Sequence, residues 1–323
     1  MTSCRSLRAE RVLIITDAWD ATTDLLVKRL GTTAFRLNTD LIRDYAIEVD
    51  EGGFKITNPA GLNISLAEIG SVYWRKPFTD DAYSANGHPD RFFYSECRYL
   101  VRELYNLALR HGASSLVEPS AERRFGKLCQ LSIARRHFDV PRWRATLGHD
   151  FAAPHGTITK SLSGEELDAD NVLYTTRVDG LTLDGAYTWL LQDHIDKSAD
   201  VTVVYVDGET FAFELTAEPG VVDWRQRLHE PGAQHWRHVT LSAALADKIR
   251  DFMGDCHLRF GRLDFAKAED GMWFLEVNPN GQWAWLDLQD EVGLIGAVLR
   301  AIQPANIGTA GSECPERCRP TAI

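Results

Sequence analysis

Residues 261–283 read GRLDFAKAEDGMWFLEVNPNGQW, and this stretch decides the fold. Two mostly apolar runs, 260–267 and 272–277, are joined by the short segment Ala-Glu-Asp-Gly. Apolar runs of this length around a glycine-containing turn predict a β-hairpin. Such a hairpin would hold the polar residues of its two strands next to one another.

The polar residues of this hairpin are expected on one face. Successive side chains of a strand point to opposite faces. Glu276 and Asn278 therefore share a face, and Leu275 and Val277 point to the other. Asp264 lies on the first strand, where cross-strand pairing can bring its carboxylate beside Glu276.

Asp264, Glu276 and Asn278 form a candidate metal site. Two carboxylates and an amide oxygen are hard ligands, which suit Mg²⁺ shared with substrate phosphates better than zinc. The alternative is a hairpin whose polar residues face solvent. Trp273 and Phe274 oppose that alternative because they make the strand mostly buried, and unpaired buried carboxylates are costly.

The N-terminal third, about residues 1–115, predicts a small α/β domain with a buried parallel strand at its start. Its expected elements are strands 11–16, 33–37, 45–50, 54–57 and 71–74 and helices 23–30 and 91–111. Strands 45–50 and 54–57 flank Glu-Gly-Gly, a hairpin signal.

The remaining chain predicts a strand-rich middle region and a mixed end. Its expected elements are helices 121–137, 241–253 and 292–302 and strands 143–146, 155–161, 172–177, 189–194, 201–206 and 210–215. The last residues, 304–323, are rich in Pro, Gly, Ser and Cys, which predicts a disordered tail.

Composition excludes several classes of protein. The chain has 323 residues and a net charge of −11, which argues against a nucleic-acid backbone as the main partner. It has no apolar run near the roughly 20 residues that a membrane span needs, and the run 12–15 is too short for a signal peptide. We therefore expect a cytoplasmic protein. The six cysteines are scattered, and free thiols are expected.

The sequence resembles the ATP-grasp superfamily, and more closely the microviridin-type peptide ligases, also called graspetide synthetases. The motifs that carry this resemblance are FRLNTD (35–40), WRKP (74–77), DWR (223–225) and FLEVNPNGQW (274–283). The likeness extends from about residue 11 to residue 302. The last motif is specific, whereas the first two are individually weak.

The resemblance implies an ATP-grasp fold of the α/β class with an α+β C-terminal part. It places a pre-ATP-grasp α/β domain in residues 1–115, a central domain in 116–195 and a magnesium-binding subdomain in 196–303. ATP and Mg²⁺ are the implied cofactors, with two metal ions held by the Asp…Glu-x-Asn set.

The resemblance also implies roles for residues of the nucleotide site. Lys127 and Lys160 match the two phosphate-binding lysines of the family. An adenine-contacting strand matches Gln192, Asp193, His194 and Ile195, and an acidic position that could bind ribose matches Asp200.

One position departs from relatives of the glutathione-synthetase and ribosomal-modification type. Thr202 stands where these commonly have arginine, so any phosphate or substrate contact of that arginine must come from another residue. The candidates are Arg225 and Arg262. Arg262 precedes Asp264 by two positions and would share its face.

The implied reaction converts a substrate carboxylate into an acyl phosphate, which a hydroxyl or amine then attacks. In this family the carboxylates are Asp or Glu side chains of a ribosomal precursor peptide, and Thr, Ser or Lys side chains attack them. The leader segment of the peptide binds the enzyme and its core reaches the ATP site; here the candidate leader contact is 201–215 with the following loop. Homodimers are common in the family, but nothing in this sequence demands one.

Two other functions are compatible with the residues. One is an ATP-grasp ligase that adds an amino acid or amine to a peptide or small acid. The other is a nucleotide-binding regulator without catalysis, which the intact Asp264, Glu276 and Asn278 set disfavours. The sequence contains no residue that we identify as the general base.

Overall fold

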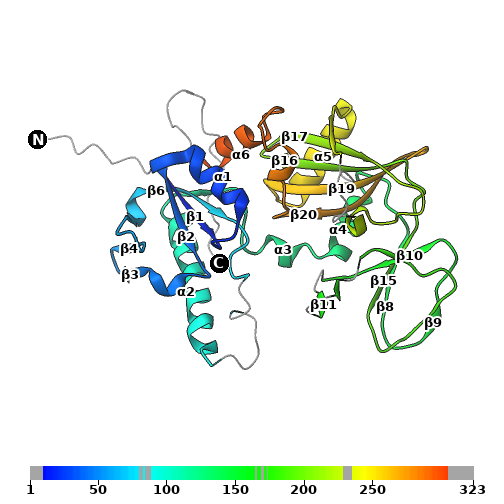
Figure 1. Cartoon of the computed structure of the whole chain (residues 1–323), viewed down its shortest axis with the longest axis horizontal. Coiled ribbons are helices and arrows are strands. Elements are labelled where there is room, and N and C mark those ends of the chain that lie inside the picture. Colours follow the sequence, from blue (N-terminus) through cyan, green and yellow to red (C-terminus); the bar gives the residue numbers. More distant parts are fainter. Residues whose placement is uncertain are drawn as a thin grey trace, which may run out of the picture.

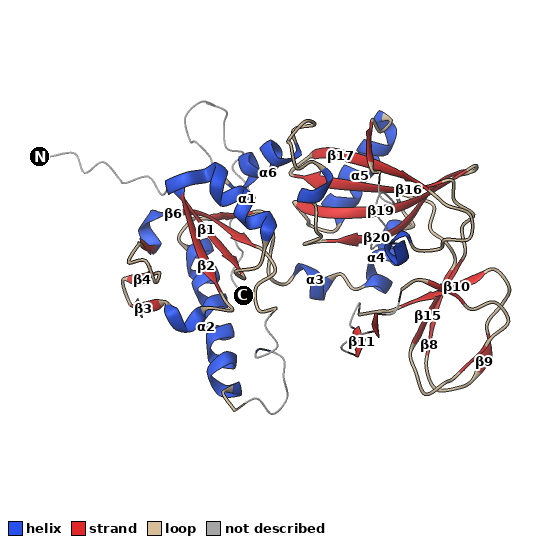
Figure 2. Cartoon of the chain, in the orientation of Figure 1, coloured by secondary structure: helices blue, strands red, loops and turns tan. Residues whose placement is uncertain are grey.

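The structure, a computed structural model, describes residues 10–79, 83, 89–163, 166–168, 171–172, 174–227 and 235–304. A parallel sheet lies at one end of the long axis, and a large antiparallel sheet with a smaller sheet beneath it lies at the other (Figure 1). Helices flank the first and the large sheet (Figure 2). The predicted disordered tail falls almost wholly outside the described residues.

The first sheet is parallel and buried on both faces. Its strands, in spatial order, are β2 (Ala34–Asn38), β1 (Arg11–Thr16), β6 (Ile69–Trp74) and β7 (Ser114–Ser115). Val12 and Ile14 share a core with helix α1 (Ala21–Leu30), and Leu13 and Ile15 share one with helix α2 (Arg91–Arg110). Burial on both faces explains the continuous apolar run, as predicted.

A small antiparallel sheet flanks the first one. It consists of β3 (Ala46–Asp50), β4 (Gly53–Thr57) and β5 (Asn63–Ser65). The predicted hairpin between β3 and β4 is confirmed, and Gly53 has a φ of 133°, which favours glycine. Strand β5 was not predicted because three residues are too few for a visible alternation.

The predicted helix 121–137 is wrong as a single element. The structure has two helices, α3 (Ala121–Arg124) and α4 (Lys127–Ala134). Gly126 lies between them with extended dihedral angles (φ −61°, ψ 159°) and is the N-cap of α4. Glycine is a poor helix interior residue, so the chain breaks there and starts α4 at Lys127.

The middle region contains an antiparallel sheet of short strands. Its spatial order is β13 (Thr176–Arg177), β10 (Thr157–Lys160), β15 (Trp189–Asp193) and β8 (Trp143–Thr146). Two small pairs accompany it: β9 (Phe151–Ala152) with β14 (Thr182–Leu183), and β11 (Glu166–Asp168) with β12 (Asn171–Val172).

The predicted strand 172–177 is also wrong as one element. Its start belongs to β12, which pairs with β11, and its end belongs to β13, which pairs with β10. The residues NVLYTTR suit a strand throughout, and propensity alone does not reveal where a chain changes its pairing partner.

The large sheet is antiparallel and five-stranded. Its spatial order is β18 (Arg237–Val239), β17 (Glu209–Thr216), β16 (Ala199–Val206), β19 (Phe260–Ala268) and β20 (Gly271–Asn278). Helices α4 and α5 (Ala243–Asp255) share the core on one face of this sheet. The hairpin predicted from residues 260–277 is therefore confirmed as β19–β20.

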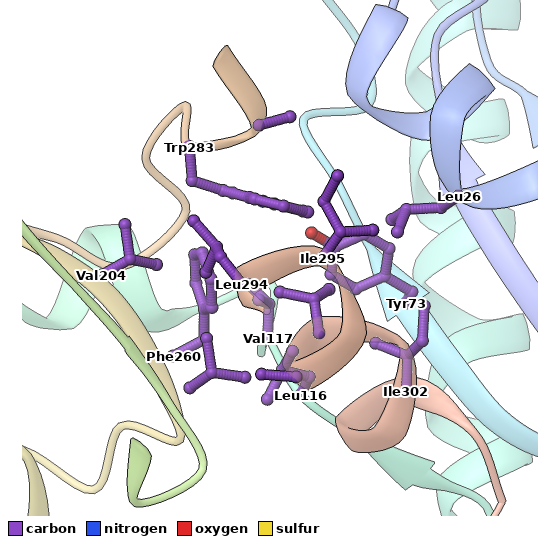
Figure 3. Close-up of a cluster of buried hydrophobic side chains, with 14 of the residues drawn as sticks. Leu26, Tyr73, Leu116, Val117, Val204, Phe260, Trp283, Leu294, Ile295 and Ile302 are labelled. Atoms are coloured by element: carbon purple, nitrogen blue, oxygen red, sulfur yellow. The ribbon is translucent and has the colours of Figure 1, made fainter. Parts of the chain in front are cut away.

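Helix α6 (Leu294–Ile302) lies between the first sheet and the large sheet. Figure 3 shows Leu294, Ile295 and Ile302 of this helix among apolar side chains from both sides, with Trp283 in the same cluster. Trp283 is completely buried there. The loop that follows β20 is thus anchored in a core shared by both ends of the molecule. None of the described helices is long and apolar enough to cross a membrane.

Candidate active site

The hairpin β19–β20 gathers the predicted metal-binding residues on one face. Asp264 pairs with Glu276 across the ladder, and Arg262 pairs with Asn278. On the other side of β19, Thr202 of β16 pairs with Asp264. Residues paired directly across strands have their side chains on the same face, so these five side chains project together.

A β-bulge modifies the hairpin beside this face. The register shifts after the pair Asp264–Glu276, which leaves Leu275 as an extra residue in β20. The expectation that Leu275 faces the core with Val277 is therefore wrong: Leu275 lines a cavity, and only Val277 joins the core. The bulge also frees the carbonyl of Leu275, which accepts a hydrogen bond from Lys160 Nζ at 3.3 Å.

Both oxygens of the Asp264 carboxylate are held by neighbours. Thr202 Oγ1 donates to Oδ1 at 2.8 Å, and Arg262 Nη2 donates to Oδ2 at 3.2 Å. Of the two candidate arginines, Arg262 is the one that binds Asp264, and Asp264 pairs with Thr202 across the strands. Arg225, the other candidate, forms its ion pair elsewhere.

Glu276 is a buried carboxylate surrounded by cations. Its exposed fraction is 9%, Lys127 Nζ lies 3.7 Å from Oε2, and Asn278 Nδ2 donates to Oε1 at 3.4 Å. Burial raises the pKa of this carboxyl group, but the positive charges of Lys160, Lys127 and Arg225 outweigh burial and hold the pKa well below its usual range. Glu276 is therefore a carboxylate at neutral pH.

The chemistry of this donor set fits Mg²⁺. Among the described residues no three His, Cys, Asp or Glu side chains gather in a metal-binding group. Asp264 and Glu276 with the amide of Asn278 offer a few oxygens only, which leaves coordination positions for water and phosphate. Mg²⁺ in nucleotide sites is bound in this way, through one or two carboxylates plus phosphates.

The two lysines approach Glu276 from different elements. Lys127 begins α4, and its Nζ donates to the carbonyl of Ser161 at 2.6 Å. Lys160 ends β10. Burial lowers the pKa of Lys160 to about 8, with a further contribution from the positive charges of Lys127 and Arg225.

The predicted adenine-contacting strand borders the same space. Gln192 and Asp193 end β15, and His194 and Ile195 follow. Gln192 is 2% exposed, and neither atom of its amide has a hydrogen-bond partner within the described part of the chain. The backbone amide of His194 donates to Gly156 O at 2.7 Å.

Two ion pairs line the same cavity. Arg225 donates to both oxygens of Asp223, from Nε at 2.9 Å and from Nη2 at 3.1 Å. Lys197 Nζ donates to Asp200 Oδ1 at 2.7 Å. Asp223 and Lys197 were not among the predicted site residues. The motif DWR could have indicated Asp223, but nothing in the sequence distinguishes Lys197.

A single cavity of about 200 Å³ brings most of these residues together. The predicted residues that line it are Lys127, Lys160, Gln192, Asp193, His194, Ile195, Asp200, Arg225, Asp264 and Glu276. Arg262 and Asn278 are not among its lining residues, although they share the strand face of Asp264 and Glu276.

An aromatic cluster lies at one side of the cavity and was not predicted. Trp224 and Trp236 line the cavity, with ring centroids 5.3 Å apart. Trp285, in the loop after β20, completes the cluster at 6.0 Å from Trp224 and 5.7 Å from Trp236. The cavity therefore combines cations, carboxylates and an apolar wall.

No protein-family model and no curated protein sequence matches this chain. Solved structures do match it. The macrocyclase MdnC bound with precursor peptide MdnA from Microcystis aeruginosa MRC has a TM-score of 0.71 and 19% identity, over 90% of this chain and 99% of that one.

Two further structures have the same arrangement. A Chryseobacterium gregarium RiPP-associated ATP-grasp ligase in complex with ADP and a leader and core peptide has a TM-score of 0.71, 20% identity and coverage of 90% and 96%. The ATP-grasp ligase PsnB, complexed with a minimal-precursor variant, Mg and ADP, has a TM-score of 0.66, 17% identity and coverage of 90% and 97%. The expected ATP-grasp fold, of mixed α/β class, is thus confirmed.

Proposed function

We propose that this chain is an ATP-dependent ligase that activates Asp or Glu side chains of a ribosomally made peptide and joins them to Thr or Ser hydroxyls or Lys amines, closing macrocycles. The observation that carries the proposal is the cavity in which Lys127, Lys160 and Arg225 surround the face of Asp264 and Glu276. The matched ligases with bound precursor peptides and ADP support the choice of substrates.

In this proposal ATP lies across the cavity. The segment 192–195 contacts adenine, and Lys127 and Lys160 neutralise phosphate oxygens as point charges. Asp264, Glu276 and Asn278 hold Mg²⁺, with two ions as in the resemblance. Bound Mg²⁺ would supply further neutralisation of the phosphate charge.

The residues of the chain act by positioning and charge rather than as nucleophiles, as phosphoryl transfer requires. The substrate carboxylate attacks the γ-phosphorus while the bond to ADP breaks, which gives the acyl phosphate. Arg225, held by Asp223, orients the carboxylate, and Arg262 supports the charged face through Asp264. A hydroxyl or amine then attacks the acyl carbon, losing its proton, and phosphate leaves.

The proposal includes the partners and the organisation of the chain. The peptide binds through a leader as well as its reacting core, and the protein acts in the cytoplasm. The functional division is a pre-ATP-grasp domain in residues 1–115, a central domain in 116–195 and a magnesium-binding subdomain in 196–303.

The test is to incubate the protein with ATP, Mg²⁺ and a small peptide rich in Thr, Ser, Asp and Glu that is encoded beside its gene. We expect ADP release and a peptide that loses one water per bond formed. Asp264→Asn is the control, and it should keep its fold and form no product. A mass gain from an added amino acid would indicate the carboxylate–amine ligase instead, and peptide unchanged without ADP release would refute catalysis.

A further inference from the structure

The guanidinium group of Arg75 is completely buried where β6 ends. Its Nη1 donates to the backbone O of Asn280 at 2.6 Å and to Oδ1 of the same residue at 2.8 Å. Its Nη2 donates to Gln282 Oε1, and Asp20 Oδ2 lies 3.6 Å from Nε. One side chain of the first sheet thus binds the loop after β20 at three acceptor atoms.

The acidic partner of Arg75 is itself fixed. Asp20 is the N-cap of α1 and accepts from the backbone N of Thr22 at 3.1 Å. Its other oxygen accepts from the hydroxyls of Thr16 at 3.0 Å and Thr23 at 2.8 Å. Asp20 is therefore held by β1 and α1, and it keeps a negative charge in a fixed place beside the guanidinium of Arg75.

The loop that Arg75 binds continues directly to the metal-binding face. The carbonyl of Gln282 accepts from Arg262 Nη1 at 3.0 Å, and the same guanidinium donates to Asp264. Gly281 N donates to Asn278 O at 3.1 Å, which closes the turn onto the last predicted metal ligand. A rigid connection therefore runs from the first sheet through this loop to Asp264 and Asn278.

Arginine suits this position because its planar group presents several donors in fixed directions. Three acceptors on Asn280 and Gln282 lie around one buried guanidinium, which is an arrangement that a lysine ammonium cannot reproduce. Burial makes this arrangement demanding, because an ion without partners in the interior costs several kcal/mol. Hydrogen bonds that only joined the first sheet to the large sheet would not have to involve the loop beside Asn278.

We infer that Arg75 is a positioning residue for the metal-binding face: it fixes loop 279–283 and thereby the orientation of Asn278 and of Asp264 through Arg262. The inference rests on the proposed function, because it assumes that Mg²⁺ binds these residues together with a nucleotide. Outer groups that orient metal ligands typically change metal affinity by about 10–100-fold when they are removed.

The test is isothermal titration of the full chain with ADP, in the presence and in the absence of Mg²⁺. The wild-type protein should bind ADP more tightly with Mg²⁺. In Arg75→Met this gain should fall about 10-fold, whereas metal-free ADP binding should stay unchanged because Lys127, Lys160 and segment 192–195 are untouched. Gln282→Met, at an exposed side chain, should reduce the gain in the same direction without endangering the fold.

Ser71→Ala is the matched control. Ser71 lies on β6, the strand that directly precedes Arg75, and its hydroxyl donates to the carbonyl of Ile302. It therefore also joins the first sheet to the C-terminal part, but this bond does not involve loop 279–283. This variant should keep the full gain from Mg²⁺.

A folded Arg75→Met protein with the full gain would overturn the inference, as would an equal loss in Ser71→Ala. If Arg75→Met does not fold, Gln282→Met decides alone, and an undiminished gain there overturns the inference. A wild-type protein that does not bind ADP refutes the proposed function instead.

Discussion

Replacing Glu276 by glutamine should destabilise the protein in a manner that depends on pH. The change keeps the shape of the side chain but removes the negative charge that stabilises the ammonium of buried Lys160 most strongly. Removing one partner of a buried ion pair costs about 3–5 kcal/mol. We expect the lower end, about 3 kcal/mol, because the side chain of Lys127 is 20% exposed and its ammonium group can turn toward water.

The pH dependence follows from Lys160. Its pKa is about 8 in the folded wild-type protein, below its ordinary value of 10.5. Between these two pH values the unfolded chain binds more protons than the folded protein, so the contribution of Lys160 to stability rises with pH. Without Glu276 the folded-state pKa of Lys160 falls further. The variant therefore starts this rise at lower pH. Its deficit relative to wild type should be largest below the lowered Lys160 pKa of the variant and should shrink as pH rises toward 8.

Urea unfolding at two pH values, about 6.5 and about 9, measures this deficit. Glu214→Gln is the matched control: Glu214 is a buried carboxylate in the same sheet, but its partners Lys267 and Arg237 have side chains that are 46% and 69% exposed and can be rehydrated. It should show a smaller deficit without this trend. An equal deficit at both pH values for Glu276→Gln would refute the electrostatic reasoning.

Two further predictions concern neighbouring positions. Lys160→Met should raise the KM for ATP at least about tenfold, the effect of losing roughly 1.4 kcal/mol of phosphate binding; steady-state ADP release measures it, and an unchanged KM would contradict the phosphate role. Gly281→Ala should destabilise the protein by about 1–3 kcal/mol, because the added Cβ would lie 2.9 Å from the Cβ of Arg262 and 3.1 Å from the Cβ of Asn278. Thermal unfolding measures this loss, and a melting temperature equal to wild type would show that the loop adapts.

The metal-binding face could be predicted because its information is local. Asp264, Glu276 and Asn278 lie on one hairpin, and strand periodicity alone puts the last two on the same side. The bulge at Leu275 could not be predicted in this way, since one extra residue shifts every later side chain to the other face. The alternation was right for Glu276 and wrong for its neighbour for that reason.

Residues far apart in the sequence needed more than periodicity. Lys127 and Lys160 are ordinary polar positions in isolation, and only the order of motifs in the resemblance indicated them. Lys197 could not be predicted because its ion pair with Asp200 joins a loop residue to a strand, where no periodicity marks a partner. The contact between Trp224 and Trp236 depends on tertiary packing. The helix predicted for residues 121–137 is interrupted before Lys127 because of Gly126. The apolar pattern on both sides of this glycine is nevertheless typical of one continuous helix.

Gln130 gives the two lysines different mechanical attachments. Its side-chain amide donates to the carbonyl of Phe125 and accepts from the backbone N of Val277 at 3.0 Å, which fastens α4 to β20. Gln130 therefore links the helix that carries Lys127 to the strand that carries Glu276, whereas Lys160 belongs to the middle sheet and reaches β20 through its hydrogen bond to the carbonyl of Leu275. Lys127 also donates to the carbonyl of Ser161, the residue after Lys160. Any outward displacement of the middle sheet would therefore have to break a hydrogen bond of each lysine, Lys127 to Ser161 and Lys160 to Leu275.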